Sequence, residues 1–288
     1  MKNKVKKAKK EKKPSVWIER FKHDKKATIV YFVLRLITIA VLIRSIFNQQ
    51  WEAVFTCWLT LVLFLIPEFV EKNFKVELPT ALEIVAFIFV FCAEILGELG
   101  CYYVKYSFWD TMLHTVSGFM FAAFGFCLVD ILNRNNRFSF KLSPVFLSLV
   151  AFCFSMTTGI LWEFFEFLAD VVLHTDMQKD FIVQGFSTVT LDESASNIAV
   201  QLKDITHTVI HHADGSETLI MGGYLDIGII DTMKDLFVNF VGAVIFSVIG
   251  YFYVKDDGKN KIASSFIPIV EDGPVTDALD NTDESSEK

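Results

Sequence analysis

Long runs of apolar residues alternate with short polar segments along most of the chain. A helix needs roughly 20 mostly apolar residues to cross a bilayer, and a soluble fold rarely contains several runs of that length. The pattern therefore predicts an all-α fold, a polytopic membrane bundle of about six transmembrane helices. We expect the first five helices within residues 27–173, at 27–47, 51–70, 81–99, 109–132 and 143–173. We expect the sixth at residues 226–254.

Residues 174–225 form the one sizeable polar insert, between the fifth and sixth predicted helices. Within it, residues 206–221 predict a β-hairpin, because β-branched residues flank Asp214-Gly215, a strong two-residue turn signal. Residues 192–205 have amphipathic character and predict a helix. The insert is therefore expected to be a small folded element outside the apolar bundle.

The charged residues are gathered at the two ends of the chain. The net charge is -7 over 288 residues, yet residues 1–26 contain 12 Lys or Arg, and residues 271–288 contain seven Asp or Glu. A basic arm beside a first transmembrane helix acts as a topology signal and can contact anionic lipid, although a solvated, disordered arm explains it equally well. We expect a disordered acidic tail at residues 255–288. No motif indicates a nucleic-acid partner.

The distribution of Lys and Arg predicts the orientation. With the N-terminus inside, 20 of these residues lie on the inner side of the predicted helices and four on the outer side. Positive residues favour the cytoplasmic side. We therefore expect a multi-pass protein of the cell membrane, plasma or inner, with both termini cytoplasmic and the insert outside.

Acidic residues and one histidine interrupt the apolar runs at helical spacing. Residues three or four positions apart lie on one face of a helix, and the alternating direction of the helices brings these residues to the outer half of the bilayer. Ionisable groups at that depth are costly and are usually functional. The residues concerned are Glu94 on the third predicted helix, Asp110 and His114 on the fourth, Glu163 and Glu166 on the fifth, and Asp231, Asp235 and Asn239 on the sixth.

Several of these polar residues also have a plainer explanation. Asp170, Asp226 and Glu98 stand near predicted helix ends and are best explained as interfacial carboxylates. Asp110 alone would be explained by a helix N-cap. Lys234 is either a counter-charge or a side chain that reaches the surface. The combination on several helices favours a shared polar site over these separate explanations.

Three motifs carry a resemblance to a known family. They are Trp109-Asp110-x3-His114-x3-Gly118-Phe119, then Leu161-Trp162-Glu163-x2-Glu166-Phe167-x2-Asp170 followed by Met177-Gln178, and Asp231-Thr232-x2-Asp235-x3-Asn239-x2-Gly242-Ala243. Together they resemble the YjdF-type inner-membrane family, over about residues 30–255. More distantly, the order of the polar residues is similar to the VanZ-like family, linked to teicoplanin tolerance, although Thr111 stands where that pattern commonly has a basic residue. The YjdF-type family has no settled biochemical activity, so the resemblance implies fold and location.

The first functional hypothesis is an intramembrane site that acts on an envelope or lipid-linked substrate. Carboxylates with an imidazole suit Mg, Mn or Zn, and several carboxylates in one apolar cavity require a cation or protons as compensation. Candidate catalytic residues are Asp110, His114, Glu163, Glu166 and Asp235, and a glutamate that binds no metal would be the general base. Candidate metal ligands are Asp110, His114 and Glu166. Candidate substrate-binding residues are Asp231, Asn239 and Glu94.

Two other hypotheses remain open. A series of Asp, Glu and His side chains in a helix bundle also suits a proton- or ion-coupled transporter. Alternatively, the cluster only holds helices together in a structural or regulatory membrane protein. The sequence contains no HExxH motif and no evident nucleophile, so it leaves open whether the protein is an enzyme.

Overall fold

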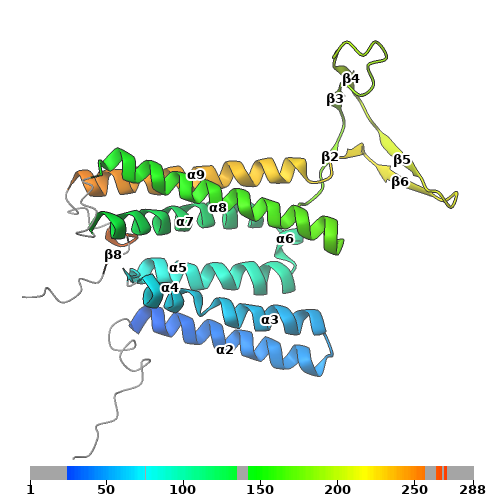
Figure 1. The fold of residues 1–288 in the computed structure, drawn as a ribbon. Coiled ribbons are helices and arrows are strands. Elements are labelled where there is room, and N and C mark those ends of the chain that lie inside the picture. Colours follow the sequence, from blue (N-terminus) through cyan, green and yellow to red (C-terminus); the bar gives the residue numbers. More distant parts are fainter. Residues whose placement is uncertain (1–24, 75, 135–141, 257–263, 268, 271–288) are drawn as a thin grey trace, which may run out of the picture. The chain divides into compact units, whose positions relative to one another are not determined.

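The structure is a computed structural model, and it describes residues 25–74, 76–134, 142–256, 264–267 and 269–270 (Figure 1). It divides into two units. The first contains Met1–Lys105 and Tyr253–Lys288, and the second contains Tyr106–Phe252. The predicted basic arm, except Lys25 and Lys26, and most of the predicted acidic tail lie outside the described residues.

Within the described residues, six helical stretches are long and apolar enough to cross a membrane. This confirms the predicted fold class, a polytopic bundle of helices. The stretches are Lys25–Phe47, Trp51–Phe74, Thr80–Leu99, Trp109–Val129, Pro144–Leu173 and Ile229–Lys255.

The first unit contains three of these stretches. Two of them change geometry along their length. The stretch Trp51–Phe74 is interrupted just before Pro67, a residue that lacks a backbone N–H. A short antiparallel pair joins β1 (Val76–Glu77) to β8 (Ile269–Val270). The helices are α2 (Lys25–Phe47), α3 (Trp51–Leu63) with α4 (Ile66–Phe74), α5 (Thr80–Val90) with the π-helix η1 (Phe91–Leu99), and the short α6 (Tyr102–Lys105).

The aromatic rings of Tyr31 on α2, Phe87 on α5 and Phe64 in the turn between α3 and α4 form a buried cluster of the first unit. Their ring centroids lie between 5.2 and 6.2 Å apart. Such distances are typical of aromatic pairs that contribute beyond their buried area.

The second unit is built on α7 (Trp109–Arg134), α8 (Pro144–Leu173) and α9 (Ile229–Lys255). Small residues let these helices approach closely, as is common in membrane proteins. A Cβ atom at Gly242 on α9 would meet the backbone of Thr115 on α7, and one at Gly125 on α7 would meet the Phe154 side chain on α8. The three polar motifs of the sequence all lie on these closely packed helices or just beyond them.

Local sequence signals define the ends of α8 and α9. Ser143 caps α8 by accepting a hydrogen bond from the Phe146 N–H at 3.3 Å, and Pro144 occupies the first turn. The helix ends where His174 takes a left-handed conformation. At the start of α9, the Asp226 carboxylate accepts hydrogen bonds from the N–H groups of Ile230 and Phe181, at 2.9 and 2.6 Å. Asp226 is therefore a helix cap that also ties down the insert.

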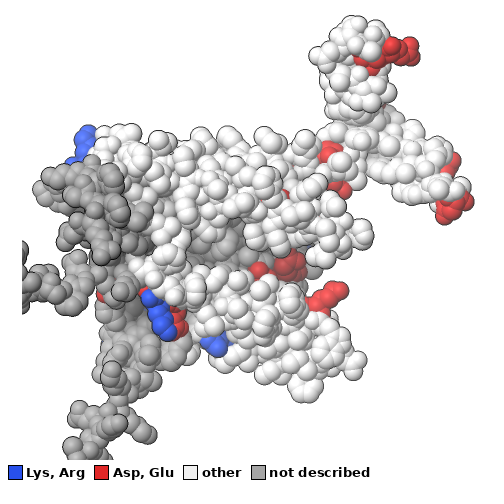
Figure 2. Space-filling view, in the orientation of Figure 1, with Lys and Arg blue, Asp and Glu red and all other residues white. Residues whose placement is uncertain are grey.

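The insert contains three antiparallel strand pairs beyond the ends of α8 and α9 (Figure 1). The segment predicted as a hairpin forms β5 and β6, joined by five residues rather than by a two-residue turn. In Figure 2 the visible surface of the helices is almost free of charge, whereas acidic side chains gather on the insert. The pairs are β2 (Ile182–Val183) with β7 (Tyr224–Leu225), β3 (Phe186–Thr188) with β4 (Val200–Leu202), and β5 (His207–His211) with β6 (Glu217–Met221).

The helix expected at residues 192–205 is wrong, because the structure has a turn followed by β4 there. The Asp192 carboxylate accepts hydrogen bonds from the backbone N–H groups of Ser194, Ser196 and Ile198. In addition, Ala195 and Asn197 adopt positive φ angles, which interrupt a right-handed helix. A side chain that bonds its own local backbone competes with helix formation.

Candidate functional site

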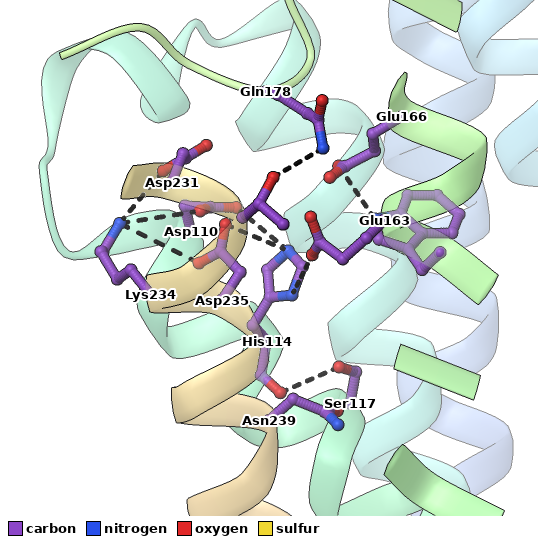
Figure 3. A network of polar contacts seen from close by, with 12 residues as sticks. Asp110, His114, Ser117, Glu163, Glu166, Gln178, Asp231, Lys234, Asp235 and Asn239 are labelled. Atoms are coloured by element: carbon purple, nitrogen blue, oxygen red, sulfur yellow. Dashed lines mark hydrogen bonds and ion pairs between the residues drawn. The ribbon is translucent and has the colours of Figure 1, made fainter. Parts of the chain in front are cut away.

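His114 lies at the centre of a cluster formed by three helices (Figure 3). Its Nε2 lies 3.5 Å from Oδ1 of Asp110 and 3.9 Å from Oδ2 of Asp235. Its Nδ1 lies 4.0 Å from Oε1 of Glu163. The imidazole thus presents one nitrogen to carboxylates from α7 and α9, and the other nitrogen to a carboxylate from α8.

Helical periodicity explains how these side chains meet. Asp110 and His114 are one turn apart on α7, and Asp231, Asp235 and Asn239 repeat every four residues on α9. The three α9 residues are all buried, as are Glu163 and Glu166 on α8. The indole Nε1 of Trp162 donates a hydrogen bond to Oε1 of Glu166 at 2.9 Å. The structure therefore brings together all five of the predicted catalytic residues.

Lys234 faces the cluster. Its Nζ lies 3.5 Å from Oδ1 of Asp231, 3.9 Å from Oδ2 of Asp110 and 4.0 Å from Oδ1 of Asp235. Its side chain is 32% exposed and also lies over the Phe181 ring. Of the two roles open from the sequence, the structure places Lys234 as a counter-charge.

The first residues of the insert lie against the cluster. The side-chain amide of Gln178 donates to the Thr232 hydroxyl at 2.6 Å, and the Lys179 N–H donates to Asp231 at 2.9 Å. Asp170, expected as an interfacial carboxylate, accepts hydrogen bonds from the N–H groups of Met177 and Gln178. Gln178 and Thr232 belong to the sequence motifs, but the sequence alone did not predict a role for them. Their positions near acidic residues in the chain were the signal that could have indicated one.

Asn239 lies below the carboxylates, among the helix backbones. Its Nδ2 is 3.5 Å from the backbone oxygen of Ser155 and 3.5 Å from Sδ of Met156. A Cβ atom at Gly159 would come within 2.6 Å of this Nδ2. The residue predicted to bind substrate thus contacts α8. Glu94, the other candidate outside the cluster, lies on η1 of the first unit.

Three carboxylate oxygens in the cluster are buried and have no hydrogen bond from the residues that the structure describes: Oδ2 of Asp110, Oε2 of Glu163 and Oδ1 of Asp235. Glu163 is only 4% exposed and Asp235 only 2%. Two of these oxygens, Oδ2 of Asp110 and Oδ1 of Asp235, lie 3.9 and 4.0 Å from the Lys234 ammonium group, and burial of a carboxylate oxygen without a hydrogen bond is unfavourable. The cluster therefore has acceptor capacity that suits a bound cation or protons.

The geometry offers two groups of three possible ligands, which share His114. One group is Asp110, His114 and Asp235, and the other is His114, Glu163 and Glu166. Within each group the ligand atoms lie within 4.8 Å of one another. Ligands of a tetrahedral ion are roughly 3.3 Å apart when each bond is about 2.0 Å. Small side-chain rotations would therefore be sufficient to bind an ion, and oxygen with imidazole ligands suits Mg, Mn or Zn.

Fold and site together define a polytopic helical membrane protein with an acidic, histidine-containing cluster between three helices. Residues 30–256 match a family described as "Predicted membrane protein (DUF2238)", and the chain belongs to that family. The comparisons name neither the YjdF-type nor the VanZ-like family, so those two resemblances remain predictions.

The chain is also similar to an uncharacterized protein of Thermotoga maritima, with 30% identity over 107 residues. The match covers 37% of this chain and 53% of the relative, so the chain spans about half of that protein's length. No solved structure matches the chain.

Proposed function

We propose that this protein binds a divalent cation between α7, α8 and α9 and acts with it on a lipid-linked or envelope substrate. The observation that carries this proposal is the group of three possible ligands His114, Glu163 and Glu166, whose two carboxylates are buried and whose ligand atoms lie within 4.8 Å of one another. With the predicted orientation, a substrate would reach the cluster from the outer side of the membrane. The gathered acidic side chains are the reason to prefer a cation over a neutral ligand.

The residues have distinct roles in this proposal. His114 and Glu166 bind the cation, with Glu163 completing the ligand set, and the bound ion would polarise an oxygen of the substrate. A carboxylate that does not bind the ion, such as Asp235, would accept a proton from the attacking group. Trp162 holds the Glu166 carboxylate through its N–H group. Gln178 and Thr232 position the start of the insert over the site.

A second candidate function is a proton- or ion-coupled transporter. The observation that favours it is the continuity of the ionisable contacts, because Lys234 contacts Asp110 and Asp235, and both contact His114, which contacts Glu163. Proton relays in membrane transporters consist of such a series of ionisable side chains. This candidate does not require a bound metal, so metal content separates the two functions.

The test is the metal content of the full-length protein purified in detergent, measured by mass spectrometry after dialysis against Mn²⁺ or Zn²⁺. We expect the wild type to retain metal and Glu163→Gln to lose it. Asp231→Asn is the matched control, because it removes a buried carboxylate from the same cluster that belongs to neither ligand group. Failure of the wild type to retain either metal would reject the proposal and leave the transporter and the structural or regulatory role.

A further inference from the structure

The carboxylates of Asp110 and Asp235 each divide their two oxygens between two partners, the His114 imidazole and the Lys234 ammonium group. For Asp110, Oδ1 faces Nε2 of His114 at 3.5 Å and Oδ2 faces Nζ of Lys234 at 3.9 Å. For Asp235, Oδ2 faces the same Nε2 at 3.9 Å and Oδ1 faces Nζ of Lys234 at 4.0 Å. The ammonium group of Lys234 thus lies across both carboxylates, on the side away from the imidazole (Figure 3).

The two glutamates on α8 have different surroundings. Among the described residues, the ion pairs of Lys234 reach Asp110, Asp231 and Asp235, and none reaches Glu163 or Glu166. Glu163 has its contact with Nδ1 of His114, and its Oε2 accepts no hydrogen bond. Glu166 is held by an indole N–H, which carries no formal charge. The group of Asp110, His114 and Asp235 therefore has the positive charge of Lys234 beside it, whereas Lys234 makes no ion pair with the glutamates of the other group.

From this difference we infer that Lys234 is the built-in cation of the Asp110–Asp235 pair, so that a single exchangeable divalent cation binds in the group of His114, Glu163 and Glu166. The inference rests on the proposed metal binding and adds the number of ions and the role of Lys234 in excluding a second one. A second divalent ion between Asp110 and Asp235 would have to displace an ammonium group that already contacts both. Like charges at such short distances repel strongly when they are poorly solvated. Lys234 therefore selects which of the two groups takes up metal.

The test is the number of bound ions per chain, with Mn²⁺ alone as the probe. Full-length protein in detergent is titrated and the bound metal is counted at saturation. We expect one equivalent for the wild type and two for Lys234→Met, which keeps an apolar stem but removes the charge. The second ion would be bound by the carboxylates of Asp110 and Asp235, because a neutral imidazole has a single lone pair and His114 would already bind the first ion. Lys234→Arg keeps the charge and should bind one equivalent. The double variant Lys234→Met with Glu163→Gln should retain one ion, although Glu163→Gln alone retains none.

Each outcome decides between the two claims. If neither the wild type nor Lys234→Met binds Mn²⁺, the role of Lys234 is wrong, and if the wild type also retains no Zn²⁺, the proposed metal function itself is wrong. If both bind one equivalent, metal binding is correct and the role of Lys234 is wrong. A wild type that binds two equivalents also overturns that role. So does a Lys234→Met variant that stays unfolded in saturating Mn²⁺, because the inference requires the metal to replace the ammonium group.

Discussion

The Ser155 hydroxyl on α8 donates a hydrogen bond of 2.7 Å to the backbone oxygen of Gly118 on α7. This buried bond fixes the register of the two antiparallel helices. From it, His114 lies about 6 Å along α7 and Glu163 about 12 Å along α8, at a rise of about 1.5 Å per residue. Side chains lean toward the N-terminus of their own helix, so His114 and Glu163 lean toward each other. A single interhelical bond thus helps to place one half of the site.

Close packing of α9 against α7 should be necessary for the site. A Cβ atom at Gly242 would collide with the Thr115 carbonyl and the Phe119 N–H, next to His114. We expect Gly242→Ala to lower the free energy of unfolding by about 1–3 kcal/mol, as overpacking does, and to weaken Mn²⁺ binding. Denaturant unfolding in detergent and a metal titration measure these effects.

Gly250→Ala is the matched control for that variant, because it lies on the same helix. Its Cβ atom would lie 3.1 Å from the Phe126 ring, a much milder approach than that of a Cβ atom at Gly242 to the Thr115 carbonyl oxygen. Alanine also has a better helix propensity than glycine, so we expect a change near zero. Equal losses of stability in the two variants would contradict the proposed role of the Gly242 contact.

The sequence predicted the helices and the composition of the cluster for a simple physical reason. Apolar runs of spanning length have few alternatives, and a four-residue repeat such as Asp231, Asp235 and Asn239 has one arrangement on a helix. The polar residues of the cluster could be recognised in the sequence because ionisable residues are rare in apolar runs of this length. Alternating helix direction then led to the expectation that Asp110, Glu163 and Asp235 lie together.

Other features depend on contacts between elements, which spacing along one helix does not reveal. The sequence leaves open whether Lys234 is a counter-charge or a side chain that reaches the surface, and only the structure shows its long side chain reaching Asp110 on α7. Gln178 gains its role from Thr232, 54 residues further along the chain. The helix expected at residues 192–205 fails because the Asp192 side chain stabilises a turn, a local competition that periodicity does not register.

The orientation of the chain can be tested by labelling. From the 20-to-4 distribution of Lys and Arg, we expect a cysteine at Ser216, an exposed residue of the insert, to react with an impermeant thiol reagent in intact cells. The five native cysteines are first replaced. Asn73→Cys, at the other end of a predicted helix, should react only after lysis. The reversed pattern would place the insert and the cluster at the cytoplasmic side.

The Asp192 turn should open only in strong acid. A hydrogen bond from the Ser194 hydroxyl, together with backbone N–H groups, lowers the pKa of Asp192 to about 2. Because the folded pKa is depressed, the contribution of this carboxylate is fully present above its unfolded pKa, about 3.9, and is lost as the pH falls through about 2. We expect pepsin cleavage at the adjacent, exposed Leu191 to be slow at pH 4 and to rise steeply toward pH 2.

Two variants serve as controls for this pH dependence. Asp192→Asn should be cleaved at Leu191 rapidly over the whole range, relative to an unstructured reference peptide. Asp214→Asn removes a carboxylate in the other loop of the insert, whose pKa is also lowered by hydrogen bonds, and should leave cleavage at Leu191 unchanged. A wild-type cleavage rate that follows the reference peptide at every pH would show that Asp192 does not hold the turn.

Neutralising Glu163 should affect stability in opposite directions with and without metal. Its Oε2 is buried without a hydrogen bond, and such a group costs about 1–3 kcal/mol. In a chelator we therefore expect Glu163→Gln to be more stable than the wild type by about that amount. In Mn²⁺ at about 100 times its Kd, the wild type should gain about 2.7 kcal/mol, whereas the variant should gain nothing. Thermal unfolding in detergent, with and without Mn²⁺, gives both comparisons.

Asp235→Asn provides the contrast, because Asp235 contacts both Lys234 and His114. Removal of one partner from a buried ion pair is destabilising, so this variant should lose stability in chelator. It should still be stabilised by Mn²⁺, since Asp235 lies outside the group of His114, Glu163 and Glu166. If the cluster only holds the helices together, both variants should instead lose stability equally in chelator and in Mn²⁺, and the cation site would have to be abandoned.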